Sequence, residues 1–411
     1  MSDSTAVPMS DRAAALGEVA RVFLKIGALS YGIGIMGVMQ LETQEKRQWL
    51  SKQQFVEGLA LVNMLPGLPG FQLAIFLGHA KGSLIGGILA GLCLILPAFF
   101  YVLAVSTAYV AFGSLPTAQS AFYGIAPVVI GIFAASVYKL GRNAVQERAQ
   151  IAILVAAAAL MLLTPVSLVA TLLAGGCVGI ALFHSRRIGL ISLAVLIATV
   201  ASYEVFAPLL TAASVSGSGT PVHASGTPGL GQLAAFFLEV GAFSFGSGLS
   251  ILAFIQDQVV NQYGWLTPKE FIDLLSLGQL IPGPPMMIAA FVGFKLVGVQ
   301  GAAVAASAIF LPSFIMMLAI LPLLQKMQDL QWLKAFMRGA GPAVIGALAV
   351  SVTQMAPPAA PDVFTWVVLA LTIALILLRN AGPLPLIVGG GAIGLLVRTT
   401  GVWERIASFA W

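Results

Sequence analysis

Two Pro-Gly breaks interrupt apolar runs that otherwise have the composition of membrane helices. The first break is NMLPGLPGFQ, starting at Asn63, and the second is GQLIPGPPMM, starting at Gly278. Proline lacks the backbone N–H and glycine imposes little restraint, so a helix cannot continue through either stretch. A short helix that starts after such a break directs free N–H groups and a partial positive charge at one place, which suits an anion. The alternative is that these prolines only kink membrane helices.

The residues expected to contact an oxyanion lie at and just before these breaks. They are Asn63, Pro66, Gly67, Pro69 and Gly70 in the first break and Gln279, Pro282, Gly283 and Pro284 in the second. Asn63 and Gln279 hold equivalent positions three residues before a proline, and their amides can donate hydrogen bonds without a fixed charge. Such amides can equally join membrane helices to one another.

A second pair of breaks is predicted at two serine-glycine motifs. These are Ser30-x-Gly32-x-Gly34 and Ser244-x-Gly246-x-Gly248. Their hydroxyl and N–H groups could add donors to the same site. Close helix packing through small residues is an equally good explanation.

Four ionisable residues in apolar surroundings are candidates for attracting the anion or carrying a proton. Lys25 and Glu239 are equivalent positions with opposite charge, so one could attract an anion and the other carry a proton, or the two could pair. Glu57 and Asp273 are equivalent carboxylates, each nine residues before a Pro-Gly proline. A position at the membrane surface is the alternative for Glu57 and Asp273.

The composition predicts an all-α, multi-pass integral membrane protein. Of 411 residues, 59% are hydrophobic and 9% are charged, whereas soluble domains carry about 25% charged residues. Apolar stretches of about 20 residues recur along the chain. The net charge of +5 is explained by cytoplasmic loops and does not argue for nucleic acid. No cofactor or metal site is expected, because Cys93 and Cys177 have no Cys or His at ligand spacing.

The chain consists of two copies of one sequence unit. FLKIGALSYGIG matches FLEVGAFSFGSG, and WLSKQQFVEGLALVNMLPG matches WLTPKEFIDLLSLGQLIPG. Further on, Gly124 matches Gly339 and Gly175 matches Gly390. The predicted parts are a tail (1–18), a first repeat (19–183), a link with one extra membrane segment (184–231), a second repeat (232–400) and a C-terminal tail (401–411).

An inverted arrangement of the two repeats is favoured by the positive charges. If the first two segments of each repeat dip into the membrane and return, most of the 20 Lys and Arg residues fall in the cytoplasm. Fewer do so if those segments cross. Equivalent loops also differ in charge: one contains Lys139, Arg142 and Arg148, and its counterpart TQMAPPAAPD has no cation. Inverted repeats with broken helices at the midplane are typical of secondary transporters.

These motifs resemble the chromate ion transporter family in its long, two-domain form. The resemblance rests on FxxxGxxSxG, then WLxxxxF, then a Pro-Gly motif followed by a long apolar segment ending in Leu-Pro, and it covers nearly the whole chain. Each half of that family usually carries Gln followed by PGP. The second half has this as GQLIPGP, whereas the first reads NMLPGLPG, with Asn63 for the glutamine and Leu68 before Pro69.

The resemblance implies export of chromate across the bacterial inner membrane, driven by the proton gradient or by anion exchange. The residues by themselves indicate only that the protein transports an oxyanion. Sulfate therefore remains an alternative substrate, and a channel remains an alternative mechanism. An enzyme is not expected, because the sequence has no HExxH, GxSxG or Cys/His cluster. The expected partners are the oxyanion and the lipid bilayer, and a homodimer is compatible with such a fold.

Overall fold

The computed structural model describes six stretches of the chain, and regular structure within them is entirely helical. The stretches are residues 9–30, 35–164, 166–214, 228–244, 249–321 and 330–399. Four of the described helices are long and apolar enough to cross a bilayer, namely Pro69–Phe112, Pro116–Ala144, Pro285–Ile320 and Gln331–Ala359. Shorter apolar helices accompany them. The prediction of an all-α, multi-pass membrane protein is confirmed.

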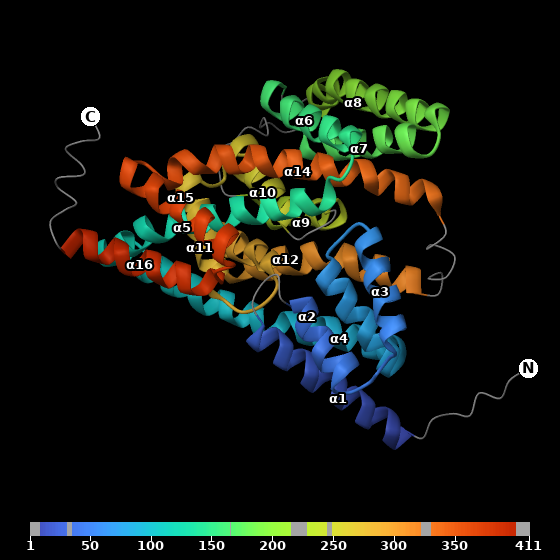
Figure 1. Cartoon of the computed structure of the whole chain (residues 1–411), viewed down its shortest axis with the longest axis horizontal. Helices are drawn as coiled ribbons and strands as arrows, with labels where there is room; N and C mark the ends of the chain where they lie inside the picture. Colours follow the sequence, from blue (N-terminus) through green and yellow to red (C-terminus); the bar gives the residue numbers. More distant parts are fainter. Residues whose placement is uncertain are drawn as a thin grey trace, which may run out of the picture. The chain divides into compact units, whose positions relative to one another are not determined.

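The chain forms two compact units, and both sequence repeats contribute to each of them (Figure 1). Unit 1 consists of Met1–Gly113, Gly229–Gly248 and Leu277–Asp329. Unit 2 consists of Ser114–Pro228, Leu249–Ser276 and Leu330–Trp411. A repeat is therefore a unit of sequence, whereas a compact unit is assembled by exchange of helices between the repeats.

Unit 1 carries both kinds of break that the sequence identified. Its elements are α1 (Met9–Leu29), α2 (Ile35–Met39), the π-helical turn η2 (Gln40–Glu45), α3 (Lys52–Met64), α4 (Pro69–Phe112), α9 (Leu230–Ala242), the end of α11 (Pro268–Leu280), the 3₁₀ turn η4 (Pro285–Met287) and α12 (Ile288–Ile320).

The first hairpin of unit 1 consists of α1 on one side and of α2 and η2 on the other. Lys25 on α1 lies 3.3 Å from Glu42 on η2, and the Trp49 indole donates to Glu18 at 3.1 Å. Residues on opposite sides of the SYGIG motif are therefore neighbours. The chain enters through α1 and returns through α2 and η2, with Ser30 as the last described residue before the tip.

The second hairpin of unit 1 is formed by α3 and the first part of α4, with PGLPG at its tip. Ser51 and Gln54 cap the start of α3 reciprocally, and Pro69 starts α4, where its missing N–H costs nothing. Gly58 on α3 packs so closely on the Phe76 ring of α4 that a methyl group there would overlap it. The two helices thus fold back on one another, as a re-entrant segment requires.

α4 turns back once more, at Gly82 and Ser83. Ser83 has φ +59°, and a methyl group on Gly87 would lie 3.0 Å from the Ile75 carbonyl oxygen. In a straight helix, residues 75 and 87 would be about 18 Å apart. α4 is therefore a half-helix, 69–81, followed by a long limb, 84–112. The predicted half-helix after the Pro-Gly break is present.

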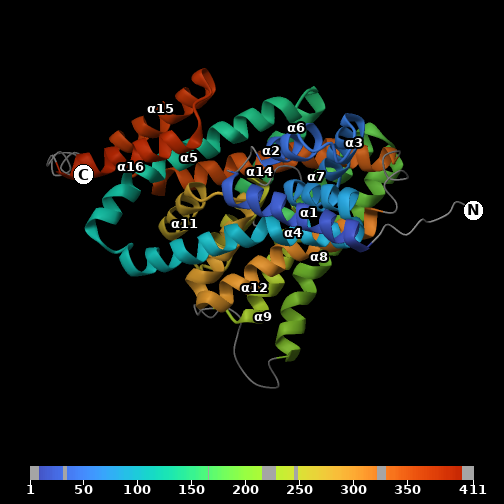
Figure 2. The same ribbon diagram turned by 90° about the horizontal axis from the view of Figure 1, so that it is seen from below.

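The second repeat contributes α9 and α12 to unit 1, whereas α10, η3 and most of α11 belong to unit 2. α12 turns at Val297 and Gly298, where Gly298 has φ +68°. Gly27 of α1 packs on the backbone of Leu94 in α4, and the equivalent Gly241 of α9 packs on the backbone of Ile309 in α12. α12 also packs against α4, and Figure 2 shows α1, α4 and α12 beside one another.

Unit 2 exchanges helices between the repeats. Its elements are α5 (Pro116–Ala144), α6 (Arg148–Leu163), α7 (Leu168–Phe183), α8 (Arg186–Ser214), α10 (Leu249–Gln256), the π-helical turn η3 (Asp257–Gln262), most of α11, α14 (Gln331–Ala359), α15 (Val363–Arg379) and α16 (Pro383–Thr399).

Glycines that match between the two repeats lie where helices of one repeat pack against helices of the other. α5 of the first repeat packs against α15 and α16 of the second, and α14 of the second packs against α6 and α7 of the first. Gly124 on α5 lies directly on the backbone of Gly390, and the equivalent Gly339 on α14 lies on the backbone of Gly175. Small residues allow this close approach of helix backbones in lipid, where apolar burial gives little preference.

A methyl group at Gly339 should destabilise unit 2, because it would overlap the Gly175 carbonyl oxygen. We expect Gly339→Ala to lower the free energy of unfolding by about 1–3 kcal/mol. Gly341→Ala is the control on the same helix, because nothing lies within 4 Å of the added methyl group. Unfolding of the detergent-purified variants by denaturant measures both effects, and equal stability of the two variants would contradict the proposed packing.

Candidate functional site

The Pro-Gly tips and the serines of the serine-glycine motifs meet in two crossed pairs in unit 1. The Gly67 N–H of the first repeat donates to the Ser244 carbonyl of the second at 2.5 Å, and the Gly283 N–H of the second repeat donates to the Ser30 carbonyl of the first at 2.8 Å. Each Pro-Gly tip is therefore bonded to the serine-glycine tip of the other copy. The structure brings together the two pairs of motifs that the sequence singled out.

Glycine is required at both Pro-Gly tips by the backbone conformation. Gly67 has φ +115° and Gly283 has φ +127°, a region in which a side chain is strained. An added methyl group would lie 2.5 Å from Ser313 Oγ at Gly67, and would overlap the Ala98 methyl group at Gly283. The Pro-Gly breaks thus fix a backbone shape as well as ending a helix.

The first Pro-Gly tip is lined by polar groups that the sequence analysis missed. Ser313 Oγ on α12 accepts a hydrogen bond from the Leu68 N–H at 2.9 Å, and Gln72 Nε2 donates to the Pro66 carbonyl at 2.8 Å. Gln72 and Ser313 are both fully buried. The signal for Ser313 was present in the sequence, because the repeated Leu-Pro motif is followed by Ser313 in one copy and by Ala98 in the other.

Several predicted contact residues belong to the tips, and others point elsewhere. Pro69 and Gly70 form the buried start of α4, and Pro284 precedes η4. The Asn63 side chain is exposed, and its amide donates to the Leu59 carbonyl of its own helix at 2.8 Å. Gln279 is half-buried at the end of α11. Gly32 and Gly246 lie outside the described residues.

The four predicted charge-carrying residues do not gather at the tips. Lys25 pairs with Glu42, and Glu239 is exposed on α9, so the two equivalent positions are not paired with each other. Glu57 is exposed on α3 and accepts from Gln53 at 3.0 Å. Asp273 is buried in unit 2.

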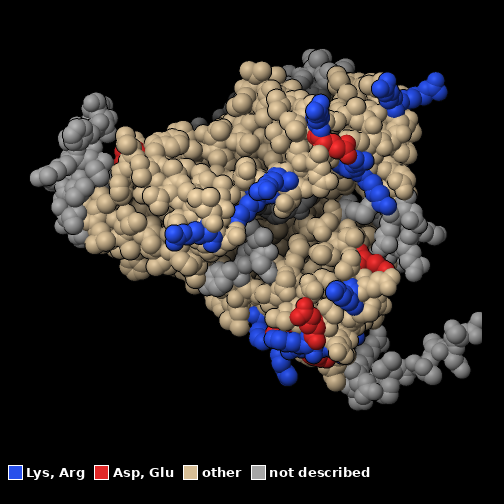
Figure 3. All heavy atoms as spheres, viewed as in Figure 1, with Lys and Arg blue, Asp and Glu red and all other residues tan. Residues whose placement is uncertain are grey.

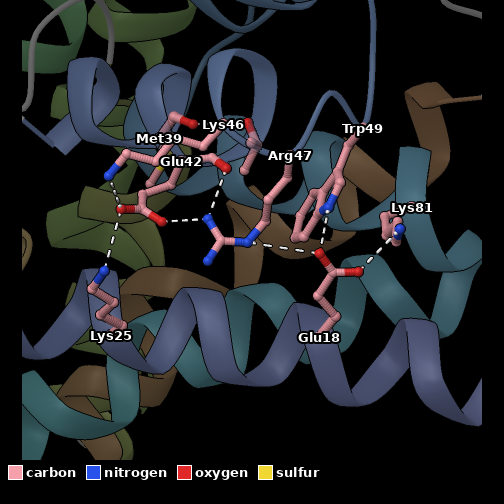
Figure 4. A network of polar contacts seen from close by, with 9 residues as sticks. Glu18, Lys25, Met39, Glu42, Lys46, Arg47, Trp49 and Lys81 are labelled. Atoms are coloured by element: carbon pink, nitrogen blue, oxygen red, sulfur yellow. Dashed lines mark hydrogen bonds and ion pairs between the residues drawn. The ribbon is translucent and has the colours of Figure 1, made fainter.

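A network of ion pairs holds the base of the first hairpin together (Figure 4). The Glu42 side chain is 7% exposed; its Oε1 lies 3.3 Å from Lys25 Nζ and 3.0 Å from Lys46 Nζ, and its Oε2 pairs with Arg47. The Arg47 guanidinium also lies 3.7 Å from Glu18. Arg47 therefore links the two carboxylates.

Glu18 extends the network to α4. Its carboxylate lies 3.0 Å from Lys81 Nζ and accepts from the Trp49 indole. Blue and red side chains gather over the α1 region in Figure 3, and a second group lies at the upper right of the same face. With two carboxylates among four cations, the network leaves an excess of positive charge.

The second repeat has no copy of this network in its sequence. Gln232 stands at the position equivalent to Glu18, Gln258 at that of Glu42 and Tyr263 at that of Arg47. The bases of the two copies are therefore chemically different although their folds match.

Protonation of Glu42 should destabilise the first hairpin. The hydrogen bonds from Lys46 and Arg47 outweigh the effect of burial and lower the pKa of Glu42 from 4.5 to about 2. Because the pKa of Glu42 is lower in the folded than in the unfolded protein, its ionisation stabilises the folded state at pH values above about 4.5. This stability is lost as the pH falls from about 4.5 towards about 2.

We expect Glu42→Gln to cost about 1 kcal/mol of stability at neutral pH, once solvent screening is considered. The difference from wild type should shrink as the pH falls below about 4. Thermal unfolding of the purified protein at a series of pH values measures this. The exposed Glu45 in the same turn supplies the control Glu45→Gln, and a difference that does not change with pH would argue against the network.

The fold and site define a multi-pass membrane protein made of two sequence copies, with broken-helix tips of the two copies paired in unit 1. A family model described as chromate transporter matches residues 17–180 and 231–395. The chain belongs to the chromate transporter family. The two matched regions nearly coincide with the two repeats found in the sequence, 19–183 and 232–400.

The relatives cover nearly the whole chain. A chromate transport protein of Cupriavidus metallidurans is 34% identical over 385 residues, which is 93% of this chain and 93% of the relative. A probable chromate transport protein of Synechococcus elongatus is 32% identical over 379 residues, covering 90% and 91%. A chromate transport protein of Pseudomonas aeruginosa is 30% identical over 338 residues, covering 81% and 79%. No solved structure matches the chain.

Proposed function

We propose that this protein exports chromate from the cytoplasm across the bacterial inner membrane as a secondary transporter. The family and the printed functions of the relatives support chromate as the substrate. The secondary-transport mechanism is proposed from one observation, the crossed pairing of the tips. Each pair joins a tip of one sequence copy to a tip of the other.

The paired tips form the proposed substrate site. The first turn of the α4 half-helix leaves N–H groups without acceptors inside the helix, and its dipole favours an anion. Motion of one hairpin against its partner breaks one pair, Gly67 with Ser244 or Gly283 with Ser30, while the other holds. Opening the pairs in turn would expose the site to one side of the membrane at a time.

The charge distribution supports entry from the cytoplasm. The network around Glu42 and Glu18 carries excess positive charge, and the positive-inside rule assigns its cations to the cytoplasmic side. A positive surface raises the local concentration of an anion. Coupling to protons or to another anion is part of the proposal, with Glu57, Asp273 and Glu239 as the candidate proton carriers.

Inverted membrane vesicles test the function directly. Vesicles containing the protein should accumulate labelled chromate against its gradient, excess sulfate should compete if both anions fit, and collapse of the proton gradient should stop proton-coupled uptake. Vesicles without the protein are the control. Uptake that only equilibrates the two sides would indicate a channel, and absence of uptake would refute transport of chromate.

The tip glycines should be essential for transport. Gly283→Ala places a methyl group against Ala98 at φ +127°, so the tip can no longer pair with Ser30, and we expect transport to fall to the background of empty vesicles. Gly278→Ala is the control, because nothing lies within 4 Å of its added methyl group. Both variants should insert in the membrane at wild-type levels. Full transport by Gly283→Ala would exclude the tips as the site.

A further inference from the structure

The two Pro-Gly tips differ in polarity, although their backbones match. At the first tip, a methyl group on Gly67 would lie 2.5 Å from both Gln72 Nε2 and Ser313 Oγ. At the second tip, the equivalent methyl group would meet the side chain of Ala98. The fully buried Gln72 and Ser313 thus flank one glycine, and an alanine lies against the other.

The polar groups at the first tip have hydrogen-bonding capacity that the protein does not use. Gln72 Oε1 and Ser244 Oγ are buried without a partner among the described residues. The Pro66 carbonyl takes one of the two hydrogens on Gln72 Nε2, which leaves the other free. Ser313 Oγ accepts from the Leu68 N–H, so its own hydrogen is available to a ligand.

The orientation of the Gln72 amide is determined by its surroundings. Exchange of Oε1 and Nε2 would place two acceptors, Oε1 and the Pro66 carbonyl, against each other at 2.8 Å. The donor therefore faces Gly67 and Ser313, and Oε1 is left for an O–H or N–H that arrives from outside the protein. Buried polar groups without partners are unfavourable in an apolar interior, so this arrangement indicates a ligand site.

The second copy forms its tip without these polar groups. The chain segment equivalent to the start of α4 places Met287 and Ile288 where the first copy has Gln72, and Ala98 replaces Ser313. The crossed hydrogen bond from the Gly283 N–H to the Ser30 carbonyl forms there as well. Pro284, which has no N–H, stands where the first copy has Leu68, so Ser313 also satisfies a backbone donor that the second tip lacks. The unpartnered Gln72 Oε1 has no such structural explanation.

We propose that the protein binds one tetrahedral oxyanion per chain, at the first Pro-Gly tip, through Gln72 Nε2, Ser313 Oγ and Ser244 Oγ. Gln72 Oε1 then accepts from a water molecule or a hydroxyl group that enters with the anion. The second tip, with Ala98, supplies an apolar wall. This inference rests on the proposed function in placing the substrate at the tips, and it adds that the two tips are not equivalent.

Equilibrium dialysis of the purified full-length protein with labelled sodium chromate, and separately with labelled sodium sulfate, tests the site. We expect one anion per chain, and about tenfold or greater loss of affinity in Ser313→Ala and in Gln72→Met. The controls are Ser106→Ala, which removes another buried and unpartnered hydroxyl of unit 1, and Gln53→Met, which removes an exposed amide of α3. Both should bind like wild type.

A Gln72→Glu variant separates a contact with the anion from a structural role. It keeps the size of the side chain and replaces the N–H donor by a carboxylate, which repels an anion when ionised. Binding of sulfate should be lost at about pH 8 and recover at about pH 5, where the buried carboxyl group is protonated. If Ser313→Ala fails to fold, the pH dependence of sulfate binding by Gln72→Glu still tests whether the anion binds at the first tip. A profile for Gln72→Glu parallel to that of wild type would overturn the proposal.

The remaining outcomes separate this inference from the proposed function. Two anions per chain, or unchanged binding in both Ser313→Ala and Gln72→Met, would refute the single polar site and leave chromate export intact. Binding of sulfate alone, weakened in both variants, would uphold the site and refute chromate as the substrate. Binding of neither anion by the wild-type protein would refute both.

Discussion

Backbone polar groups inside a membrane need partners, and the central architecture of this protein follows from that constraint. A break such as PGLPG leaves N–H and carbonyl groups without helical partners, and lipid offers none. Here the Gly67 N–H and the Ser244 carbonyl satisfy each other, as do the Gly283 N–H and the Ser30 carbonyl. Each break in one copy is completed by a break in the other, so neither copy can form the centre alone.

The exchange of partners extends beyond the tips. In unit 2, Gly124 of the first copy packs on Gly390 of the second, and Gly339 packs on Gly175. Each compact unit therefore contains close contacts between the two copies.

The two copies share a backbone and differ in chemistry at two places. The base of the first hairpin is ionic, with Glu42 among Lys25, Lys46 and Arg47. The second copy has Gln258 and Tyr263 in place of Glu42 and Arg47, and Glu239 in place of Lys25. The first Pro-Gly tip has Gln72 and Ser313, where the second has apolar side chains. The repeats therefore match in their sequence motifs and differ in the side chains at these two places.

The sequence by itself determined the helical membrane class, the two copies and the positions of the breaks, because hydropathy, repetition and Pro-Gly chemistry are local properties. It also singled out Gly67 and Gly283, which lie at the paired tips. Only the tertiary structure decided that the tips pair between the copies, that Lys25 bonds Glu42, and that Gln72 and Ser313 flank Gly67. These facts depend on contacts between residues as much as 245 positions apart, and no local pattern specifies which distant backbone group satisfies a given break.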